Sequence, residues 1–443
     1  MWKFPFNTPN VVQLVGDNMK DYLTLDDIDF KGKTVLCRVD INCPIDPVTR
    51  KVTDHSRIRA HACTLDELAR KGAKVIVMSH QGRPGETDFI SLEGHAELMG
   101  RCVKHPISFV DHIFGKEAIS RIRGMKEGEI LLLENVRFYS EEMLNRPADA
   151  LAKVLPVKAL SGVADYFVND AFGAIHRSQA SLVGFGELLP AIAGRVIEGE
   201  LESLDRVFDN PNGPVVFILG GVKVRESISV INNLMINGKA DKVLTGGLLG
   251  NLLLIAKGYD LGRPSTELLR GKGIYDLLPE ARELMSRYGS RIETPVDVAV
   301  RNSGRKDVHV SELPSAHAIA DIGSETVGRY CKTIEDAGTI VMNSPLGMYE
   351  HEGFRHGTER ILSEVAKREC FKVVGGGHVG ELVGRMGLSG KFNHVSTGGR
   401  ATLYYLSGEE TPVISMLRRS RQKHFHSISG AKVNHPLPEV NRN

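Results

Sequence analysis

The sequence lacks several features that would assign a protein to a class at once: paired cysteines, an excess of one charge and long apolar runs. Its six cysteines are scattered and form no C-x-x-C pair, which argues against a structural zinc site and a disulfide framework. We therefore expect free thiols and a cytoplasmic location. The net charge is only +2, so the composition gives no reason to expect nucleic acid or a membrane as partner.

No segment predicts membrane insertion or export. The longest apolar run, residues 248–256, is broken by Gly250 and Asn251 and is too short to cross a bilayer. Residues 1–18 contain proline and asparagine and lack the apolar core of a signal peptide.

The chain alternates short β-rich runs with helical stretches, which predicts an α/β protein with parallel sheets. With 443 residues it is too long for one compact core, and we expect two domains. The first series of strands is expected at 34–40, 73–79, 129–135 and 164–170, and the second at 214–221, 241–247, 338–344, 371–377 and 393–399.

The two series of strands end in different residue types. Strands of the first half run into polar and charged residues, such as Asp40, His80 and Arg137, whereas strands of the second half run into glycines. Ligands bind at the carboxyl ends of the strands in open parallel sheets. The first half is therefore expected to hold an anion with side chains, and the second to bring a ligand against bare backbone.

The basic residues of the first half suit a small phosphorylated acid. They are Arg57, Arg59, His80, Arg83, Arg137, His176 and Arg177. Taken alone, each is better explained as a surface or salt-bridging residue. Most of them closely follow predicted strands, however, where side chains converge, and arginine binds phosphate oxygens in a bidentate manner.

The glycine motifs of the second half are weak signals singly, because a double glycine is as well explained by a packing turn. No P-loop and no complete dinucleotide fingerprint occurs. Several double glycines after predicted strands nevertheless favour a nucleotide phosphate site. Lys223, two residues beyond one of them, is placed to meet a transferring phosphoryl group.

Eight motifs together resemble the phosphoglycerate kinase family: RVDINCP, SHQGRP, LLENVRF, VNDAFGAIHRSQAS, ILGGVKV, NSPLGMYE, VVGGG and HVSTGG. The resemblance covers roughly residues 22–415 and implies two Rossmann-like domains that face each other across a cleft and bend about a hinge. It implies a phosphoglycerate-binding domain (22–193), a hinge helix (194–204) and a nucleotide-binding domain (205–416). An N-terminal extension (1–21) and a basic C-terminal tail (417–443) are expected outside the resemblance. From its composition we expect the tail to be a frayed extension.

The resemblance also implies a reaction and a set of site residues. The reaction is the reversible phosphoryl transfer between 1,3-bisphosphoglycerate and ADP, which gives 3-phosphoglycerate and ATP. Mg²⁺ is expected as the cofactor, bound with the nucleotide. No side chain is predicted as a metal ligand. A monomer is expected. The acid would be bound by Asp40, Asn42, Arg57, His80, Arg83, Arg137 and Arg177. The nucleotide would be bound by Gly221, Lys223, Asn343, Glu350, Gly375, Gly376, Gly377 and His378, and the catalytic set would be Arg57, Lys223, Gly377 and Gly399.

The departures from the family pattern lie on the nucleotide side. His378 and Ser227 resemble the archaeal branch of the family, whereas Ser344, Val379 and Arg400 stand where the usual pattern has other residues. These departures leave open a non-catalytic paralogue that still binds a phosphorylated acid. A nicotinamide oxidoreductase is the other alternative, suggested only by the glycine turns.

Overall fold

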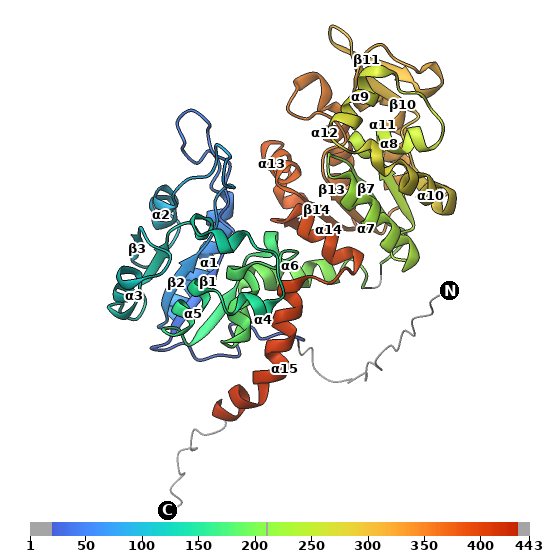
Figure 1. The fold of residues 1–443 in the computed structure, drawn as a ribbon. Helices are drawn as coiled ribbons and strands as arrows, with labels where there is room; N and C mark the ends of the chain where they lie inside the picture. Colours follow the sequence, from blue (N-terminus) through green and yellow to red (C-terminus); the bar gives the residue numbers. More distant parts are fainter. Residues whose placement is uncertain (1–19, 210, 433–443) are drawn as a thin grey trace, which may run out of the picture.

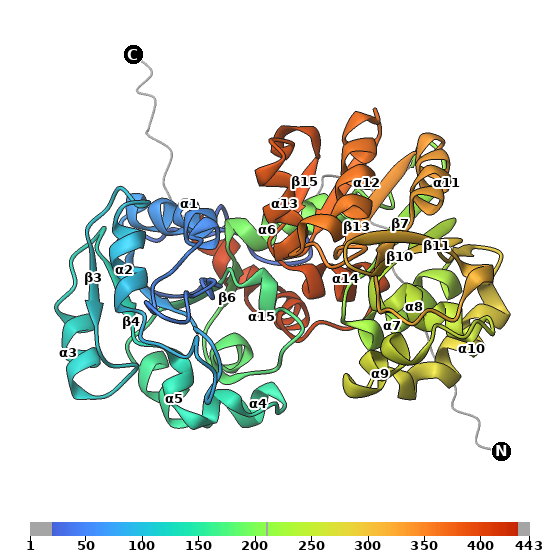
Figure 2. The same cartoon turned by 90° about the horizontal axis from the view of Figure 1, so that it is seen from above.

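The computed structural model describes residues 20–209 and 211–432, with side chains up to residue 425. The chain forms two α/β lobes joined by helix α6 (Arg195–Asp205), as Figures 1 and 2 show. Of the expected N-terminal extension (1–21), residues 1–19 lie outside the described residues. The same holds for residues 433–443 of the expected tail. Among the helices described, none is long and apolar enough to cross a membrane.

The first lobe is built on a parallel sheet with the strand order β3-β4-β2-β1-β5-β6. Its strands are β1 (Thr34–Arg38), β2 (Lys74–Met78), β3 (Ile107–Val110), β4 (Ile130–Leu133), β5 (Tyr166–Asn169) and β6 (Ala191–Ala193). Its helices are α1 (Ser56–Arg70), α2 (Glu93–Gly100), α3 (Lys116–Arg123), α4 (Ala148–Leu151) and α5 (Leu155–Ser161).

The second lobe has the parallel order β15-β14-β13-β7-β8-β9 and a small antiparallel sheet, β11-β10-β12. The parallel strands are β7 (Val215–Leu219), β8 (Lys242–Thr245), β9 (Ile292–Glu293), β13 (Thr339–Asn343), β14 (Phe371–Gly375) and β15 (His394–Ser396). The antiparallel strands are β10 (Asp297–Arg301), β11 (Arg305–His309) and β12 (Ile319–Ile322). The helices are α7 (Val224–Ile236), α8 (Gly247–Ala256), α9 (Arg263–Gly271), α10 (Leu278–Tyr288), α11 (Ser324–Glu335), α12 (His356–Lys367), α13 (Gly377–Arg385) and α14 (Gly399–Ser407).

Helices cover both faces of each parallel sheet because successive strand side chains point to opposite faces. In β1, Val35 and Cys37 pack with α1 and α2, whereas Leu36 packs in the cluster on the other face. The nine predicted strands are all confirmed, and so is the α/β class. Strands β3, β6 and β9 and the antiparallel sheet were not predicted.

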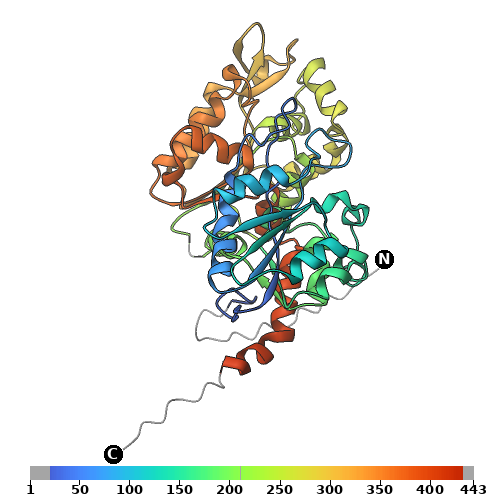
Figure 3. The same ribbon diagram turned by 90° about the vertical axis from the view of Figure 1, so that its left-hand side faces the viewer.

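The expectation of a frayed tail from residue 417 is wrong for the described part, which forms helix α15 (Pro412–Lys432). Met416 and Leu417 are buried, and the backbone N–H of Ala191 in β6 donates to the Ser420 hydroxyl at 2.7 Å. Arg418 pairs with Asp21 at 2.6 Å. The helix therefore packs on the first lobe, and its carboxyl end projects away from the body (Figures 1 and 3).

The order of strands places ligand sites at one end of each sheet. In the second lobe, the chain moves from β7 to β8 and β9 on one side, and then returns to β13 beside β7. In the first lobe, β1 and β5 are the corresponding neighbours. Loops diverge at such a switch point and leave a crevice at the carboxyl ends of the strands.

Candidate active site

A cavity of about 650 Å³ is lined by loops from both lobes. It brings together most of the residues predicted from the sequence, namely Asp40, Asn42, Arg57, His80, Arg83, Arg177, Gly221, Lys223, Asn343, Glu350, Gly376, Gly377, His378 and Gly399. Arg137 and Gly375 do not line it. Gly375 is the buried last residue of β14, and its missing side chain leaves room for the Asn343 amide, which a Cβ there would meet at 2.6 Å.

The central feature of the first-lobe wall is the ion pair between Arg57 of α1 and Asp40, which follows β1. Nη1 of Arg57 donates to Oδ2 of Asp40 at 2.8 Å. Burial raises the pKa of Asp40, but the charges of Arg57 and Arg38 outweigh burial and hold that pKa well below its ordinary value. Asp40 is therefore ionised at any physiological pH. Arg57 also reaches the carbonyl of Thr397 in the second lobe at 3.4 Å.

Behind this pair lies a basic cluster, formed by the buried Arg38, His80 and Arg137 and the half-buried Arg177. Burial, followed by repulsion from Arg177 and Arg38, lowers the pKa of Arg137 to about 10. The Nε atom of Arg137 is buried and has no hydrogen-bond partner among residues 20–209 and 211–432, while Nη1 donates to the Gly82 carbonyl. The buried carboxyl groups of Glu142 and Asp40 offset part of this repulsion but do not reverse the lowered pKa values of the three arginines. A buried donor without a partner is also costly.

Asn42 shapes the loop that carries Arg83. Its Oδ1 accepts a hydrogen bond from the backbone N–H of Gly82 at 2.9 Å. Arg83 itself is exposed at the edge of the cavity. The loop after β2 is thus held against the loop after β1. The exposed guanidinium of Arg83 lies where a ligand would enter the cavity.

The second-lobe wall is formed by the first turns of four helices. Helices α7, α8, α13 and α14 begin directly after β7, β8, β14 and β15, with Lys223, Gly246, Gly376 and Gly398 as their N-cap residues. The first turn of an α-helix has free backbone N–H groups and a partial positive charge. Four of them at one cavity favour binding of a polyanion.

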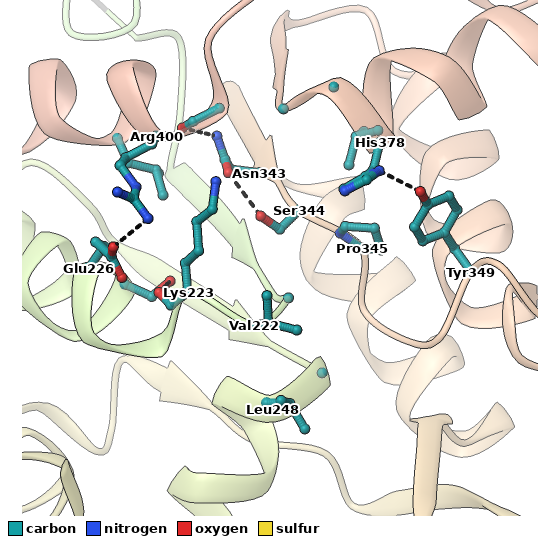
Figure 4. Close-up of a pocket in the computed structure, with 18 of the residues that line it drawn as sticks. Val222, Lys223, Glu226, Leu248, Asn343, Ser344, Pro345, Tyr349, His378 and Arg400 are labelled. Carbon is teal, nitrogen blue, oxygen red and sulfur yellow. Dashed lines mark hydrogen bonds and ion pairs between the residues drawn. The ribbon is translucent and has the colours of Figure 1, made fainter. Parts of the chain in front are cut away.

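Asn343 and Ser344 lie in the middle of this wall. The side chain of Asn343 donates to the Gly399 carbonyl at 2.9 Å, and the Ser344 hydroxyl donates to Oδ1 of Asn343 at 3.1 Å (Figure 4). Ser344 has a φ of 71°, a region that favours glycine. Serine at this position therefore causes some backbone strain. Its side chain leaves the cavity open.

His378 lies in the first turn of α13 and contacts Tyr349. Its Nδ1 shares a hydrogen bond with the Tyr349 hydroxyl (Figure 4). No side-chain hydrogen bond caps α13. The neighbouring Val379 is fully buried in the apolar cluster beneath the helix, so this departure from the family pattern serves packing.

Arg38 and Arg400 were not predicted as site residues, and His176 was named in the basic set of the first half but given no role in binding. Arg38 is a fully buried charge inside the strand-like run TVLCRVD, and a charge in such a run was the available signal. His176 stacks on Tyr404 of α14 with ring centroids 5.5 Å apart. Arg400 pairs with Glu226 of α7 at 2.8 Å (Figure 4), a contact that no sequence pattern indicated.

Comparisons with known proteins agree on one family. The family model described as "Phosphoglycerate kinase" matches residues 25–409. The phosphoglycerate kinase of Methanothermobacter thermautotrophicus is 45% identical over 401 residues, which cover 90% of this chain and 97% of the relative. That of Methanothermus fervidus is 44% identical over 406 residues, covering 91% of this chain and 99% of the relative.

Solved structures agree with the sequence comparisons. The crystal structure of phosphoglycerate kinase from Pyrococcus horikoshii matches with a TM-score of 0.85 and 38% identity, covering 90% of this chain and 100% of the other. The enzyme from Coxiella burnetii matches with a TM-score of 0.72 and 30% identity, covering 90% and 99%. With its two lobes, its basic wall and its facing helix N-termini, this chain belongs to the phosphoglycerate kinase family.

Proposed function

We propose that the two walls of the cavity bind the two substrates of the family's reaction, with the phosphorylated acid on the first lobe and the nucleotide on the second. The reaction is the reversible transfer of a phosphoryl group between 1,3-bisphosphoglycerate and ADP, giving 3-phosphoglycerate and ATP. The chain is thus a kinase whose acceptor in the reverse direction is a carboxyl group.

The assignment of the two walls rests on one observation, which is that they present different chemical groups to the cavity. The first lobe presents a cluster of mutually repelling side-chain cations, and one donor among them, Nε of Arg137, has no hydrogen-bond partner within the described part of the chain. The second lobe presents backbone N–H groups at helix N-termini, where glycines admit a phosphate chain. A compact dianion such as a 3-phosphate suits the first wall, and an extended di- or triphosphate suits the second.

On the first wall, we assign the 3-phosphate to His80, Arg83, Arg137 and Arg177. The carboxyl and hydroxyl end of the acid is assigned to Asp40 and Asn42. Arg57, held by Asp40 and already in contact with Thr397 of the other lobe, is directed toward the gap between the substrates. It is therefore our choice for the catalytic arginine.

On the second wall, Gly221, Gly376, Gly377 and Gly399 keep the backbone bare beside the nucleotide phosphates, with Asn343 between them. Gly375 contributes from behind the wall, where it leaves room for the Asn343 amide. Glu350 lies at the cavity edge, where it suits the ribose hydroxyls. His378 is assigned to the phosphate end, and Gly377 and Gly399 donate backbone N–H groups to the transferring phosphoryl group.

The transfer needs no general base. In the ATP-forming direction an oxygen of the ADP β-phosphate attacks the phosphorus at C1, forming one P–O bond. The P–O bond to the acyl oxygen breaks, and its electron pair stays on the carboxylate. No proton moves, because both oxygens are ionised at neutral pH. Catalysis therefore comes from positioning and from cations around the phosphoryl group, with Lys223 and Arg57 as the main ones.

Mg²⁺ enters this site with the nucleotide. Among the described residues, no group of three or more histidine, cysteine, aspartate or glutamate side chains is arranged to hold a metal ion. Glu226, a nearby carboxylate, is engaged by Arg400. These residues fit an ion held mainly by phosphate oxygens and water, as Mg²⁺ prefers, and the ion would neutralise phosphate charge.

The two substrates must meet, which requires the lobes to move about the connection at 194–204. We infer a phosphoglycerate-binding domain over 22–193 and a nucleotide-binding domain over 205–416. Glu200 of α6 accepts hydrogen bonds from the backbone N–H and the hydroxyl of Thr397, each at 2.7 Å. The connecting helix is thus tied to the loop that Arg57 touches, so closure and site assembly are coupled.

One chain supplies both walls, which favours a monomer, and its six free cysteines suit the cytoplasm. The test of the function is a coupled assay with 3-phosphoglycerate, ATP and Mg²⁺. We expect turnover that depends on all three. Binding of the acid without any turnover would indicate the non-catalytic paralogue instead.

A further inference from the structure

Arg400 lies on the nucleotide wall of the cavity, in the first turn of α14. One nitrogen of its guanidinium, Nη2, is paired with Oε1 of Glu226 at 2.8 Å, and the side chain is 32% exposed. Figure 4 shows the guanidinium on the same side of the cavity as Lys223. The side chain is therefore held beside the point where the phosphoryl group is proposed to pass.

Apart from its ion pair with Glu226, Arg400 has a helix N-terminus and other cations as neighbours. A cation in the first turn of a helix opposes the helix dipole. Arg400 also lowers the pKa of Lys223, after the larger effect of burial, and it contributes to the lowered pKa of His176 and Arg177. Helix stability therefore does not explain an arginine here.

The ion pair with Glu226 leaves donors of Arg400 unused. Its Nε is buried and has no hydrogen-bond partner among the described residues. Glu226 is the carboxylate that raises the pKa of Lys223, whereas Arg400, Arg177 and Arg57 all lower it. The charges around Lys223 thus have a cationic surplus that a phosphoryl group would balance.

We propose that Arg400 is a further catalytic residue, and this inference rests on the proposed function. Its guanidinium donates to the oxygens of the transferring phosphoryl group from the nucleotide side, next to Lys223. Glu226 holds the side chain in place when no phosphoryl group is present. Arg400 stabilises charge while the two P–O bonds exchange, and it neither gives nor takes a proton.

The test compares Arg400→Ala with Arg400→Lys and Glu226→Gln in the full-length enzyme with 3-phosphoglycerate, ATP and Mg²⁺. We expect Arg400→Ala to lower kcat about 100-fold, the loss typical of one donor to a developing charge. The KM of each substrate should change less than about threefold, because the contact is made chiefly in the transition state. Lysine should restore part of kcat, and guanidinium ion in solution should partly rescue the alanine variant.

Glu226→Gln breaks the same ion pair but keeps the guanidinium, so its kcat should fall far less than that of Arg400→Ala. The matched control is Arg263→Ala, which breaks the ion pair with Glu267 on the exposed helix α9. If Arg400→Ala and Glu226→Gln lose kcat equally, without rescue by guanidinium, the role of the pair is structural and the inference is wrong.

Two further outcomes separate the inference from the function on which it rests. If the parent enzyme turns over but Arg400→Ala keeps full kcat while Lys223→Ala does not, only the inference fails. If the parent enzyme itself is inactive in the assay, the proposed function fails. Arg400→Gln, which conserves more of the side-chain volume, replaces the alanine variant if circular dichroism shows that the latter is unfolded.

Discussion

Nη2 of Arg38 lies 3.0 Å from Nδ1 of His80, and both side chains are buried. A guanidinium has donors only, so Nδ1 of His80 must be the acceptor. The proton of the neutral ring is then on Nε2. Burial, followed by repulsion from Arg38, holds the pKa of His80 well below that of an ordinary imidazole. The ring is therefore a neutral donor in a fixed orientation at the wall of the cavity.

The first prediction concerns this tautomer. Nitrogen chemical shifts of histidine-labelled protein should show the Nε2–H form for His80, with no titration between about pH 6 and 8. Arg38→Lys, which keeps a buried charge but changes the donor geometry, should weaken 3-phosphoglycerate binding without an equal loss of nucleotide binding. A titrating His80 in the parent protein would contradict the assignment.

The second prediction concerns Arg137, which lies behind the cavity wall and whose Nε has no partner in the part of the chain that the structure describes. Arg137→Ala should raise the KM for 3-phosphoglycerate well over tenfold, because loss of a buried charge-assisted contact costs about 2–5 kcal/mol. The KM for ATP should hardly change. Arg123→Ala, on the exposed surface of α3 in the same lobe, should leave both constants unchanged. An unaltered KM for the acid in Arg137→Ala would remove Arg137 from the site.

The third prediction concerns Lys223 and Arg57, which come from opposite lobes. Changing either to alanine should lower kcat by roughly two to four orders of magnitude, about 3–5 kcal/mol in activation free energy. Separate binding of each substrate, measured by calorimetry, should change far less. Lys367→Ala on the exposed side of α12 is the matched control. If the variants bind each substrate more weakly but keep the kcat of the parent enzyme, these residues serve binding and not catalysis.

The fourth prediction concerns His378 and the metal. His378→Asp should weaken binding of metal-free ADP, because it adds a negative charge at the N-terminus of α13 beside the phosphates. The loss should be smaller with Mg²⁺, which accepts a carboxylate oxygen. His378→Asn, neutral and of similar size, should bind metal-free ADP nearly as well as the parent. If the aspartate variant also does so, His378 does not lie at the phosphates.

The sequence by itself determined the fold class and the position of nine strands. Runs of β-branched and aliphatic residues, flanked by polar residues or glycines, suffice to indicate strands that are buried on both faces of a sheet. The parallel strands that the sequence did not reveal, β3, β6 and β9, are short and lie at the edges of their sheets, whereas the antiparallel sheet was missed although β10 and β11 are as long as β1. Helix α15 was missed because its basic composition from residue 417 hid the apolar contacts of Met416 and Leu417.

Only the tertiary structure decided how the site residues pair. Arg57 and Asp40 are 17 positions apart, Arg38 and His80 are 42 apart, and Arg57 and Thr397 are 340 apart. Local sequence patterns identify each residue as a candidate, but they contain no information on the distances between loops. The strand order sets those distances, because it brings the loops after β1, β2 and β5 together in one lobe, and those after β7, β13, β14 and β15 in the other. The charges that these loops present to one another, Arg400 against Glu226 among them, arise from that order and from the meeting of the two lobes.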